Sequence, residues 1–256
     1  MDILKVSNLS KVYGSKVKSN ALKDISFSIE YGEFVGIMGP SGSGKTTLLN
    51  LISTIDKPTS GKITLGDKEP HKLKGDALAL FRRRELGFVF QDYNLLDTLT
   101  IGENIVLPLT LENVSVKEQD EKLKRVSKIL GIEDLLDKRT FEVSGGQAQR
   151  TAIARALINN PSIVLADEPT GNLDSKAARN VMELLEKINT KEKVTTMMVT
   201  HDPVAASYCN RILFIKDGVI YNEIYKSDNR MQFYQEIMDV LSLLGGLSNE
   251  FYSVCS

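Results

Sequence analysis

The sequence contains no tryptophan, only two histidines and only two cysteines, Cys209 and Cys255. Two cysteines do not make a disulfide framework, and neither belongs to a Cys-x-x-Cys or Cys/His cluster that would hold structural zinc. Free cysteines suit a reducing compartment. These absences exclude small secreted domains stabilised by disulfides and domains stabilised by structural zinc. We therefore expect the hydrophobic core to stabilise the fold.

The chain also lacks an excess of charge of either sign. Lys and Arg together number 32 and Asp and Glu together 33, which gives a net charge of -1. Nucleic-acid-binding domains usually carry a basic excess, so we expect no nucleic-acid partner. The local run Arg82-Arg83-Arg84 is more typical of a solvated face than of a binding patch.

Long hydrophobic runs are missing as well. No stretch approaches the roughly 20 apolar residues that a membrane-spanning helix needs. The opening residues MDILKVSNLSKVYG have neither the apolar core nor the small-residue cleavage site of a signal peptide. We therefore expect a protein that works at a membrane only through a partner.

What is present is a chain of ordinary globular composition. Its 256 residues, 42% hydrophobic and 25% charged, predict one large domain or a domain with an inserted lobe. Compact apolar runs indicate buried strands, and helically spaced Lys, Glu and Leu indicate helices. Strands are expected at residues 3–6, 25–29, 34–38, 163–166, 194–199, 212–215 and 219–221, and helices at 46–52, 116–130, 147–159 and 175–189.

These elements describe an α/β core that helical stretches interrupt. Residues 61–90 are expected to be rich in β structure, and residues from about 100 to 160 to form a mostly helical lobe. The last strand pair is expected to be a hairpin across Asp217-Gly218. After about residue 223 the apolar positions are spaced along one helix face, which favours packing on the chain's own domain over docking of a partner. These positions are Phe233, Ile237, Val240, Leu241 and Leu244.

A phosphate-binding loop is the strongest chemical signal. Residues 39–46, GPSGSGKT, fit G-x-x-x-x-G-K-[ST] between an apolar strand and a helix, which disfavours a turn that binds nothing. Glycines let successive N–H groups surround an anion, and the positive end of the helix adds to the field. Lys45 is expected to reach the β- and γ-phosphates, and the Thr46 hydroxyl to ligate Mg²⁺. The expected ATP-binding residues here are Gly39, Ser41, Gly42, Ser43, Gly44, Lys45, Thr46 and Thr47.

Two acids follow another buried strand. Asp167 and Glu168 come directly after residues 163–166, and ligands of parallel sheets bind at the carboxyl ends of strands. Asp167 would hold the Mg²⁺ shell, and Glu168 could polarise the attacking water. A solvated acid pair on a turn is the alternative, which the phosphate loop upstream disfavours.

A second glycine-rich helix start lies between these motifs. Ser144-Gly145-Gly146-Gln147 precedes a helical run, and a serine hydroxyl with bare glycine N–H groups can form a second anion site. Taken alone, the segment favours a helix cap and turn over an anion site.

Taken together, the motifs resemble those of the ABC ATPase family over residues 1 to about 222. The histidine and the Ser-Gly-Gly-Gln segment separate this family from other phosphate-loop ATPases. One departure is Val143, where the family usually has leucine, and it leaves Ser144 intact. The matching segments, in the family's order, are Tyr13 in KVYG, Gly39–Thr46, Gln91 in GFVFQ, Ser144–Gln147, Leu165–Pro169, Gly171–Asp174 and Thr200-His201-Asp202.

The resemblance implies a role for each of these positions. Tyr13 would stack on adenine, although an edge-strand tyrosine is the alternative. Gln91 would lie near Mg²⁺ and the water and couple the site to the helical lobe. His201 would contact the γ-phosphate and hold the water and Glu168 in line; a buried structural histidine is the alternative. His71 has no such context and is expected on the surface.

The resemblance also implies an assembly. Two copies would face head to tail, so that Ser144, Gly145, Gly146 and Gln147 of one copy close on ATP held by Lys45 of the other. Asp174 would support the partner's site, and Gln91, Glu168 and His201 would be catalytic. The implied fold is an α/β P-loop NTPase (RecA-like) core with an N-terminal β subdomain. Residues 1–222 would form the nucleotide-binding domain with a helical subdomain at about 92–160, and residues 223–256 a tail.

Further segments are similar to one bacterial branch of the family. Residues 82–96, 103–109 and 168–175 look like the branch of macrolide export, lipoprotein release and antimicrobial-peptide resistance, and the tail is similar to that of bacitracin-resistance exporters. This implies an ATP- and Mg²⁺-dependent ATPase on the inner face of the cell membrane. Its partners would be a permease and, through it, a sensor histidine kinase. The alternatives are a macrolide or lipoprotein role, a regulatory module, or a soluble ATPase of DNA repair or translation.

Overall fold

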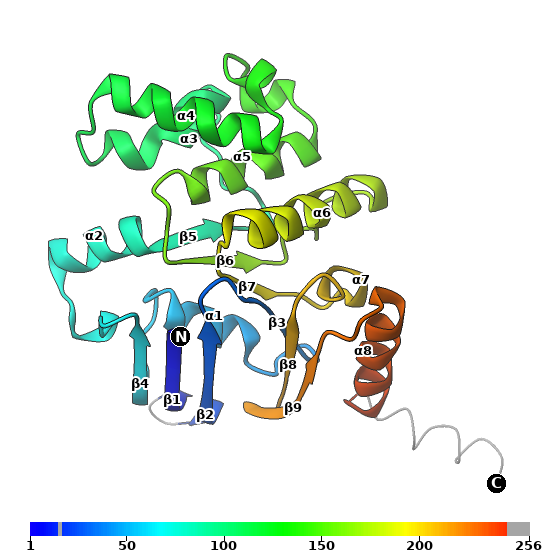
Figure 1. The fold of residues 1–256 in the computed structure, drawn as a ribbon. Helices are drawn as coiled ribbons and strands as arrows, with labels where there is room; N and C mark the ends of the chain where they lie inside the picture. Colours follow the sequence, from blue (N-terminus) through cyan, green and yellow to red (C-terminus); the bar gives the residue numbers. More distant parts are fainter. Residues whose placement is uncertain (15–16, 245–256) are drawn as a thin grey trace, which may run out of the picture. The chain divides into compact units, whose positions relative to one another are not determined.

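The computed structural model describes residues 1–14 and 17–244, so Cys255 lies outside the described residues. The chain divides into two compact units (Figure 1). The first contains Met1–His71 and the chain from Met197 onward, and the second contains Lys72–Thr196. The predicted limits of the nucleotide-binding domain, its helical subdomain and the tail remain predictions.

An antiparallel sheet begins the first unit. Strands β1 (Asp2–Tyr13), β2 (Ser19–Glu30) and β4 (Ser60–Leu65) lie in the order β2-β1-β4. Leu4 pairs with Ile29 on one side and with Leu65 on the other, and all three are buried. Alternating burial along β1 therefore builds one face of this sheet into a core.

Four further strands of the first unit lie in the order β7-β3-β8-β9. They are β3 (Phe34–Met38), β7 (Thr196–Val199), β8 (Arg211–Lys216) and β9 (Val219–Tyr225). β3 is buried along its whole length and runs parallel to β8, which is typical of an inner strand. Its carboxyl end leads through the glycine loop into helix α1 (Lys45–Ile52).

The expected hairpin and tail helix are both present in the first unit. β8 and β9 pair antiparallel across Asp217 and Gly218, which have φ of 51° and 80°. Helix α8 (Arg230–Leu244) packs on α7 (Pro203–Ala206) and β9. Its buried residues are Phe233, Ile237, Val240 and Leu244, whereas Leu241 is half-buried. The apolar face of α8 is therefore covered by its own unit.

The second unit holds a parallel strand pair with flanking helices. Its elements are α2 (Gly75–Glu85), β5 (Leu86–Val89), β6 (Ile163–Asp167) and α6 (Ser175–Glu192). β5 and β6 pair parallel, with Leu86 opposite Ile163. The expectation of β structure throughout residues 61–90 is wrong over α2, because Ala, Leu, Arg and Glu in this stretch are strong helix formers.

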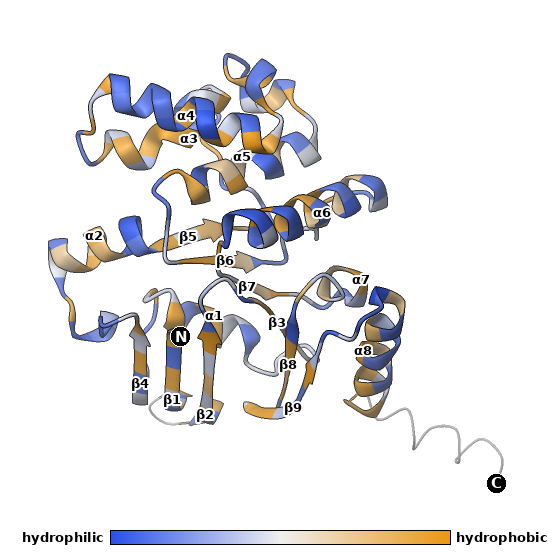
Figure 2. Cartoon of the chain, viewed as in Figure 1, coloured by the Kyte–Doolittle hydropathy of each residue, from blue (hydrophilic) through white to orange (hydrophobic). Residues whose placement is uncertain are grey.

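The expected helical lobe belongs to the second unit. Helices α3 (Ile101–Thr110), α4 (Val116–Leu130) and α5 (Gly145–Leu157) pack against one another (Figure 1). Figure 2 shows α3 as mainly hydrophobic and α4 as mainly hydrophilic, as expected for an inner and an outer helix. Short 3-10 turns at Pro70–Lys72, Glu133–Leu135 and Thr140–Glu142 complete the described elements.

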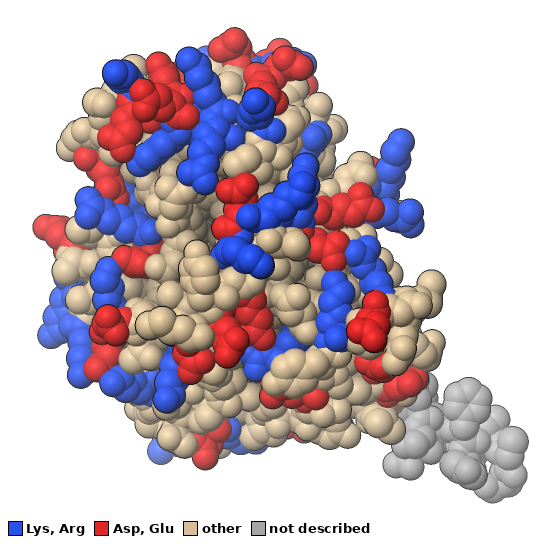
Figure 3. All heavy atoms as spheres, viewed as in Figure 1, with Lys and Arg blue, Asp and Glu red and all other residues tan. Residues whose placement is uncertain are grey.

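The described surface is mixed in charge. On the face that Figure 3 shows, Lys and Arg are interspersed with Asp and Glu. Within residues 1–14 and 17–244, no helix combines the length and the apolar character needed to cross a bilayer.

Candidate active site

The loop between β3 and α1 has a backbone that only glycine can provide. Gly39 has φ of 150°, and a Cβ there would lie 2.0 Å from the Ile215 carbonyl oxygen. Gly44 has φ of 108°, and a Cβ there would lie 2.6 Å from the Ala21 carbonyl oxygen. Both positions therefore need glycine, because their φ is positive and because β8 and β2 leave no room for a side chain.

The polar groups of this loop suit an anion. Lys45 Nζ donates to the carbonyl oxygens of Gly39 and Pro40 at 2.8 and 2.9 Å, so the ammonium group lies over the loop. The Ser43 hydroxyl is buried and has no hydrogen-bond partner in the described part of the chain. A buried hydroxyl without a partner is costly, and a phosphate oxygen would satisfy it.

Tyr13 is fixed beside this loop by a charged cluster. Its hydroxyl donates to Asp56 Oδ2 at 2.7 Å, and Lys11 Nζ lies 4.7 Å from the ring centroid and 2.7 Å from Asp56 Oδ1. Burial, assisted by the hydrogen bond to Asp56, raises the pKa of Tyr13, and Thr47 of α1 also hydrogen-bonds to it. Tyr13 as a residue remains 40% exposed, so Lys11 and Asp56 orient the side chain while leaving surface available for stacking.

His201 lies two residues after the end of β7 and is exposed, which excludes the alternative of a buried structural histidine. Its neighbours fix the backbone on both sides. The Thr200 amide donates to the Ile37 carbonyl at 3.2 Å, and Asp202 caps α7 by accepting from the Val204 amide at 2.8 Å. The backbone on either side of His201 is therefore held by hydrogen bonds.

In the second unit, the acid pair ends β6. Asp167 is the last residue of the strand, and Glu168 has φ of 46°, an uncommon conformation for a residue with a side chain. The fully buried Gln149 donates from Nε2 to the carbonyl oxygens of Pro169 and Phe90, at 2.7 and 3.3 Å. One side chain of α5 thus ties the loop after Glu168 to the segment before Gln91.

Gln91 itself lies against the loop that follows the acids. Its Nε2 donates to Asn172 Oδ1 at 3.1 Å. The Tyr93 hydroxyl, which lies at 3.5 Å from the Asn172 carbonyl oxygen, donates to it. A Cβ on Gly171 would lie 2.8 Å from the Gln91 amide, so a larger residue would displace this side chain.

The two remaining motif segments cap helices. At the start of α5, Ser144 Oγ accepts from the Gln147 amide, and Gln147 Oε1 accepts from the Ser144 amide at 2.8 Å. Asp174 Oδ1 accepts from the amides of Lys176 and Ala177, both at 2.9 Å, at the start of α6. Both segments therefore have a structural role of their own, which leaves the N–H groups of Gly145 and Gly146 in the first turn.

The family model described as ABC transporter matches residues 22–171. The chain belongs to the ABC transporter family. It is 62% identical over 99% of its length to the ABC transporter ATP-binding protein YxdL of Bacillus subtilis and covers 98% of that protein. It is 52% identical over 98% of its length, and 100% of the relative, to the bacitracin export ATP-binding protein BceA of Halalkalibacterium halodurans.

A solved structure of the ATP-binding cassette MJ0796 of Methanocaldococcus jannaschii, a dimer in a post-hydrolysis state bound to ADP and phosphate, is also similar. It is 41% identical, with a TM-score of 0.78, and the match covers 88% of this chain and 100% of that one. The predicted ABC ATPase fold and the predicted resemblance to the bacitracin-export type are therefore confirmed, and the chain is an ATPase of this family.

The residues predicted for this ABC ATPase fall into two groups. The first unit holds Tyr13, the loop with Lys45, Thr46 and Thr47, and His201, whereas the second holds Gln91, Asp167, Glu168, Asp174 and Ser144–Gln147. Lys11, Asp56, Gln149 and Asn172 were missed. Lys11 and Asn172 lie inside motif segments, and that position could have indicated a role in the site. Nothing in the sequence around Asp56 and Gln149 was used to indicate such a role.

One expectation is wrong. His71 is half-buried instead of exposed, and its Nε2 is buried without a partner in the described part of the chain. Burial lowers the pKa of His71 against an opposing hydrogen bond to the Leu51 backbone. The hydrogen bond to Leu51 places His71 beside the last turn of α1.

The residues expected to hold magnesium carry oxygen donors. Thr46, Gln91 and Asp167 offer a hydroxyl, an amide and a carboxylate oxygen, the donor type that Mg²⁺ prefers. Within the described residues, Gln91 Oε1 accepts no hydrogen bond, although the nitrogen of the same amide is engaged.

Proposed function

We propose that this chain is the ATP-hydrolysing subunit of a bacterial exporter for antimicrobial peptides of the bacitracin type. The similarity to the bacitracin export ATP-binding protein over nearly all of both chains carries this proposal. The subunit would work in the cytoplasm on the inner face of the membrane, bound to a separate permease. A sensor histidine kinase would be reached through that permease.

ATP would be held mainly by residues of the first unit. Tyr13 supplies a ring for the adenine base, and the N–H groups of the glycine loop with Lys45 supply the phosphate site. Thr46, Gln91 and Asp167 would hold Mg²⁺, which would neutralise charge on the β- and γ-phosphates. The buried Ser43 hydroxyl supports this assignment because it has a hydrogen bond to gain from a phosphate.

Hydrolysis would need a second copy of the chain. Glu168 would orient the attacking water, and His201 would contact the γ-phosphate. The Ser144–Gly146 segment of the second copy would then present its first-turn N–H groups to the same nucleotide. The dimeric structure of the similar cassette supports this arrangement.

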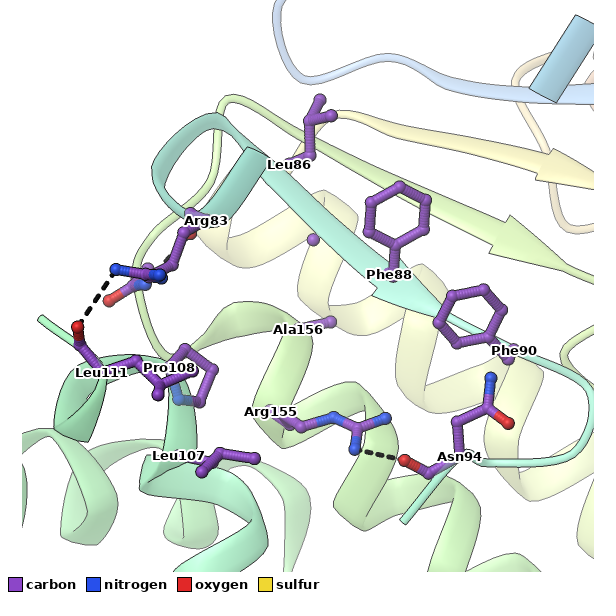
Figure 4. Close-up of a pocket in the computed structure, with 12 residues that line it drawn as sticks. Arg83, Leu86, Phe88, Phe90, Asn94, Leu107, Pro108, Leu111, Arg155 and Ala156 are labelled. Atoms are coloured by element: carbon purple, nitrogen blue, oxygen red, sulfur yellow. Dashed lines mark hydrogen bonds between the residues drawn. The ribbon is translucent and has the colours of Figure 1, made fainter. Parts of the chain in front are cut away.

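A groove in the second unit is our candidate surface for the permease. It encloses about 340 Å³, and its apolar walls include Phe88, Leu107 and Leu111 (Figure 4). The rings of Phe88 and Phe90 stack in this wall with centroids 5.4 Å apart. Because Phe90 and Asn94 also flank the Gln91 loop, an occupant would touch the loop that we assign to the metal.

Phosphate release measured on the purified chain tests the ATPase part. We expect Glu168→Gln to reduce turnover at least about 100-fold while ATP binding persists, and Lys45→Ala to lose both. Retention of binding and turnover in Lys45→Ala would remove the phosphate loop from its role. Unchanged turnover in Glu168→Gln would remove Glu168 from catalysis.

Co-purification from membranes tests the partner. We expect a polytopic permease carrying two copies of this chain. Leu111→Glu places a charge in the groove wall and should abolish recovery of the permease, whereas Val116→Glu, at another exposed position of the second unit, should not. Loss in both variants would contradict the groove assignment, and recovery of ribosomes or nucleic acid instead would contradict the transport role. Loss of bacitracin resistance on deletion tests the substrate.

A further inference from the structure

The amide of Asn172 has a defined orientation. Its Nδ2 donates to Asp92 Oδ1 at 2.7 Å and to the Gln91 carbonyl oxygen at 3.2 Å. A carboxylate and a carbonyl only accept hydrogen bonds, so the nitrogen end of Asn172 must face both of them. The oxygen end of Asn172 therefore points the other way.

The orientation of Asn172 sets that of Gln91. Because Asn172 Oδ1 can only accept, it takes a hydrogen bond from Gln91 Nε2, at 3.1 Å. The reversed Gln91 amide would bring two oxygens together at that distance. Gly171 packs against the same amide, and a Cβ there would lie 2.8 Å from Gln91 Nε2.

This arrangement matters because the two ends of a glutamine amide are nearly equal in shape but differ in chemistry. Only the oxygen end can ligate a cation, and it is the end that accepts no hydrogen bond within the described residues. We infer that Asp92 and Asn172 are positioning residues that keep the oxygen of Gln91 available to Mg²⁺. The inference rests on the proposed function, which assigns Gln91 to the metal.

The dependence of nucleotide affinity on Mg²⁺ tests this inference in an experiment in which no ATP is hydrolysed. The affinity for a non-hydrolysable ATP analogue is measured by calorimetry with saturating Mg²⁺ and again with EDTA, and the ratio of the two affinities reports the metal's contribution. Asn172→Ala should lower this ratio about two- to tenfold, as expected for loss of one orienting hydrogen bond, and leave the affinity in EDTA unchanged. Gly171→Ala should act in the same direction.

Repeating the Asn172→Ala test in the Gln91→Glu variant distinguishes an effect on the orientation of the Gln91 amide from a general structural role of Asn172. A carboxylate has oxygen at both ends, so the variant Gln91→Glu has no wrong orientation. Asn172→Ala should therefore lower the ratio in the wild-type background but not in the Gln91→Glu background. Gln232→Ala, which removes an exposed amide hydrogen bond to Glu236 in the other unit, is the matched control and should leave both affinities unchanged.

Two results overturn the inference alone: an unchanged ratio in Asn172→Ala, or equal losses in the two backgrounds. Either result has this meaning only if Gln91→Ala itself lowers the affinity ratio, which shows that Gln91 contributes to metal-dependent binding. If Gln91→Ala leaves the ratio unchanged, then Gln91 does not ligate the metal. That result would overturn the inference together with the metal assignment of the proposed function.

Discussion

The hydroxyl of Tyr13 donates a hydrogen bond of 2.7 Å to Asp56, whose other carboxylate oxygen lies 2.7 Å from Lys11 Nζ. The three side chains come from the end of β1, the middle strand of its sheet, and from the loop after α1, so they join that strand to the helix of the phosphate loop. The ring that we assign to adenine is therefore set in place before any nucleotide arrives, and less conformational freedom is lost on binding.

Tyr13→Ala should weaken ATP binding by about 1–3 kcal/mol, or roughly 5- to 150-fold, because stacking on the base is lost. Tyr13→Phe keeps the ring but loses the bond to Asp56, so its effect should be smaller and should match that of Asp56→Ala. Calorimetry with ATP measures these losses, and inorganic triphosphate is the control, since its binding should not change. An equal loss for triphosphate would show that the effect is not on the base.

The sequence predicts the phosphate loop well because that site is local. Strand β3, the glycine loop and α1 follow one another within residues 34–52, and the predicted strand at 34–38 has the bounds of β3. Helix α4 likewise has the predicted bounds, because its end is signalled by Gly131 in a left-handed conformation. Flanking residues are sufficient to define such elements.

Contacts between distant residues could not be predicted in this way. Gln91 and Asn172 are 81 residues apart, and Tyr13 and Asp56 are 43 apart. A motif places Gln91 on a loop after a strand but does not say which amide it meets there. The burial of His71 was missed for the same reason, since Leu51, whose backbone it meets, lies upstream and no pattern near His71 indicates the contact.

Arg155 should be needed to hold the Gln91 loop in place. Its guanidinium donates to the carbonyl oxygens of Asn94 and Tyr93 at 2.5 and 2.8 Å, and both of those residues have positive φ. Arg155→Lys retains one charge but cannot bridge two carbonyls, so we expect a loss of about 1–3 kcal/mol in the free energy of unfolding. Urea unfolding measures this loss.

The same variant should separate binding from turnover. Arg155 belongs to α5, which begins at the Ser144 cap, so loosening the loop should lower ATPase turnover several-fold. ATP affinity should change little, because Tyr13 and Lys45 lie in the other unit. A large loss of ATP affinity with normal turnover would be the opposite pattern and would rule out this role for Arg155.

His71 should make the protein less stable in mild acid. Burial lowers its pKa, and the nearby positive charge of Lys57 acts in the same direction, against the Leu51 hydrogen bond and Asp56. The unfolded chain, with an ordinary histidine pKa of about 6.5, then takes up the proton more readily than the folded chain. The stabilisation is therefore present above that pKa and is lost as the pH falls through it toward the lower folded value.

Urea unfolding of His71→Gln at several pH values between 7.5 and 5 measures this contribution. Glutamine keeps a donor for the Leu51 carbonyl but cannot take up a proton, so the variant should lose less stability than the wild type over this interval. Carboxylates titrate in both proteins, so their contribution cancels in the difference between the two curves. Parallel curves would contradict the prediction, because they would mean that His71 has the same pKa in the folded and unfolded chains.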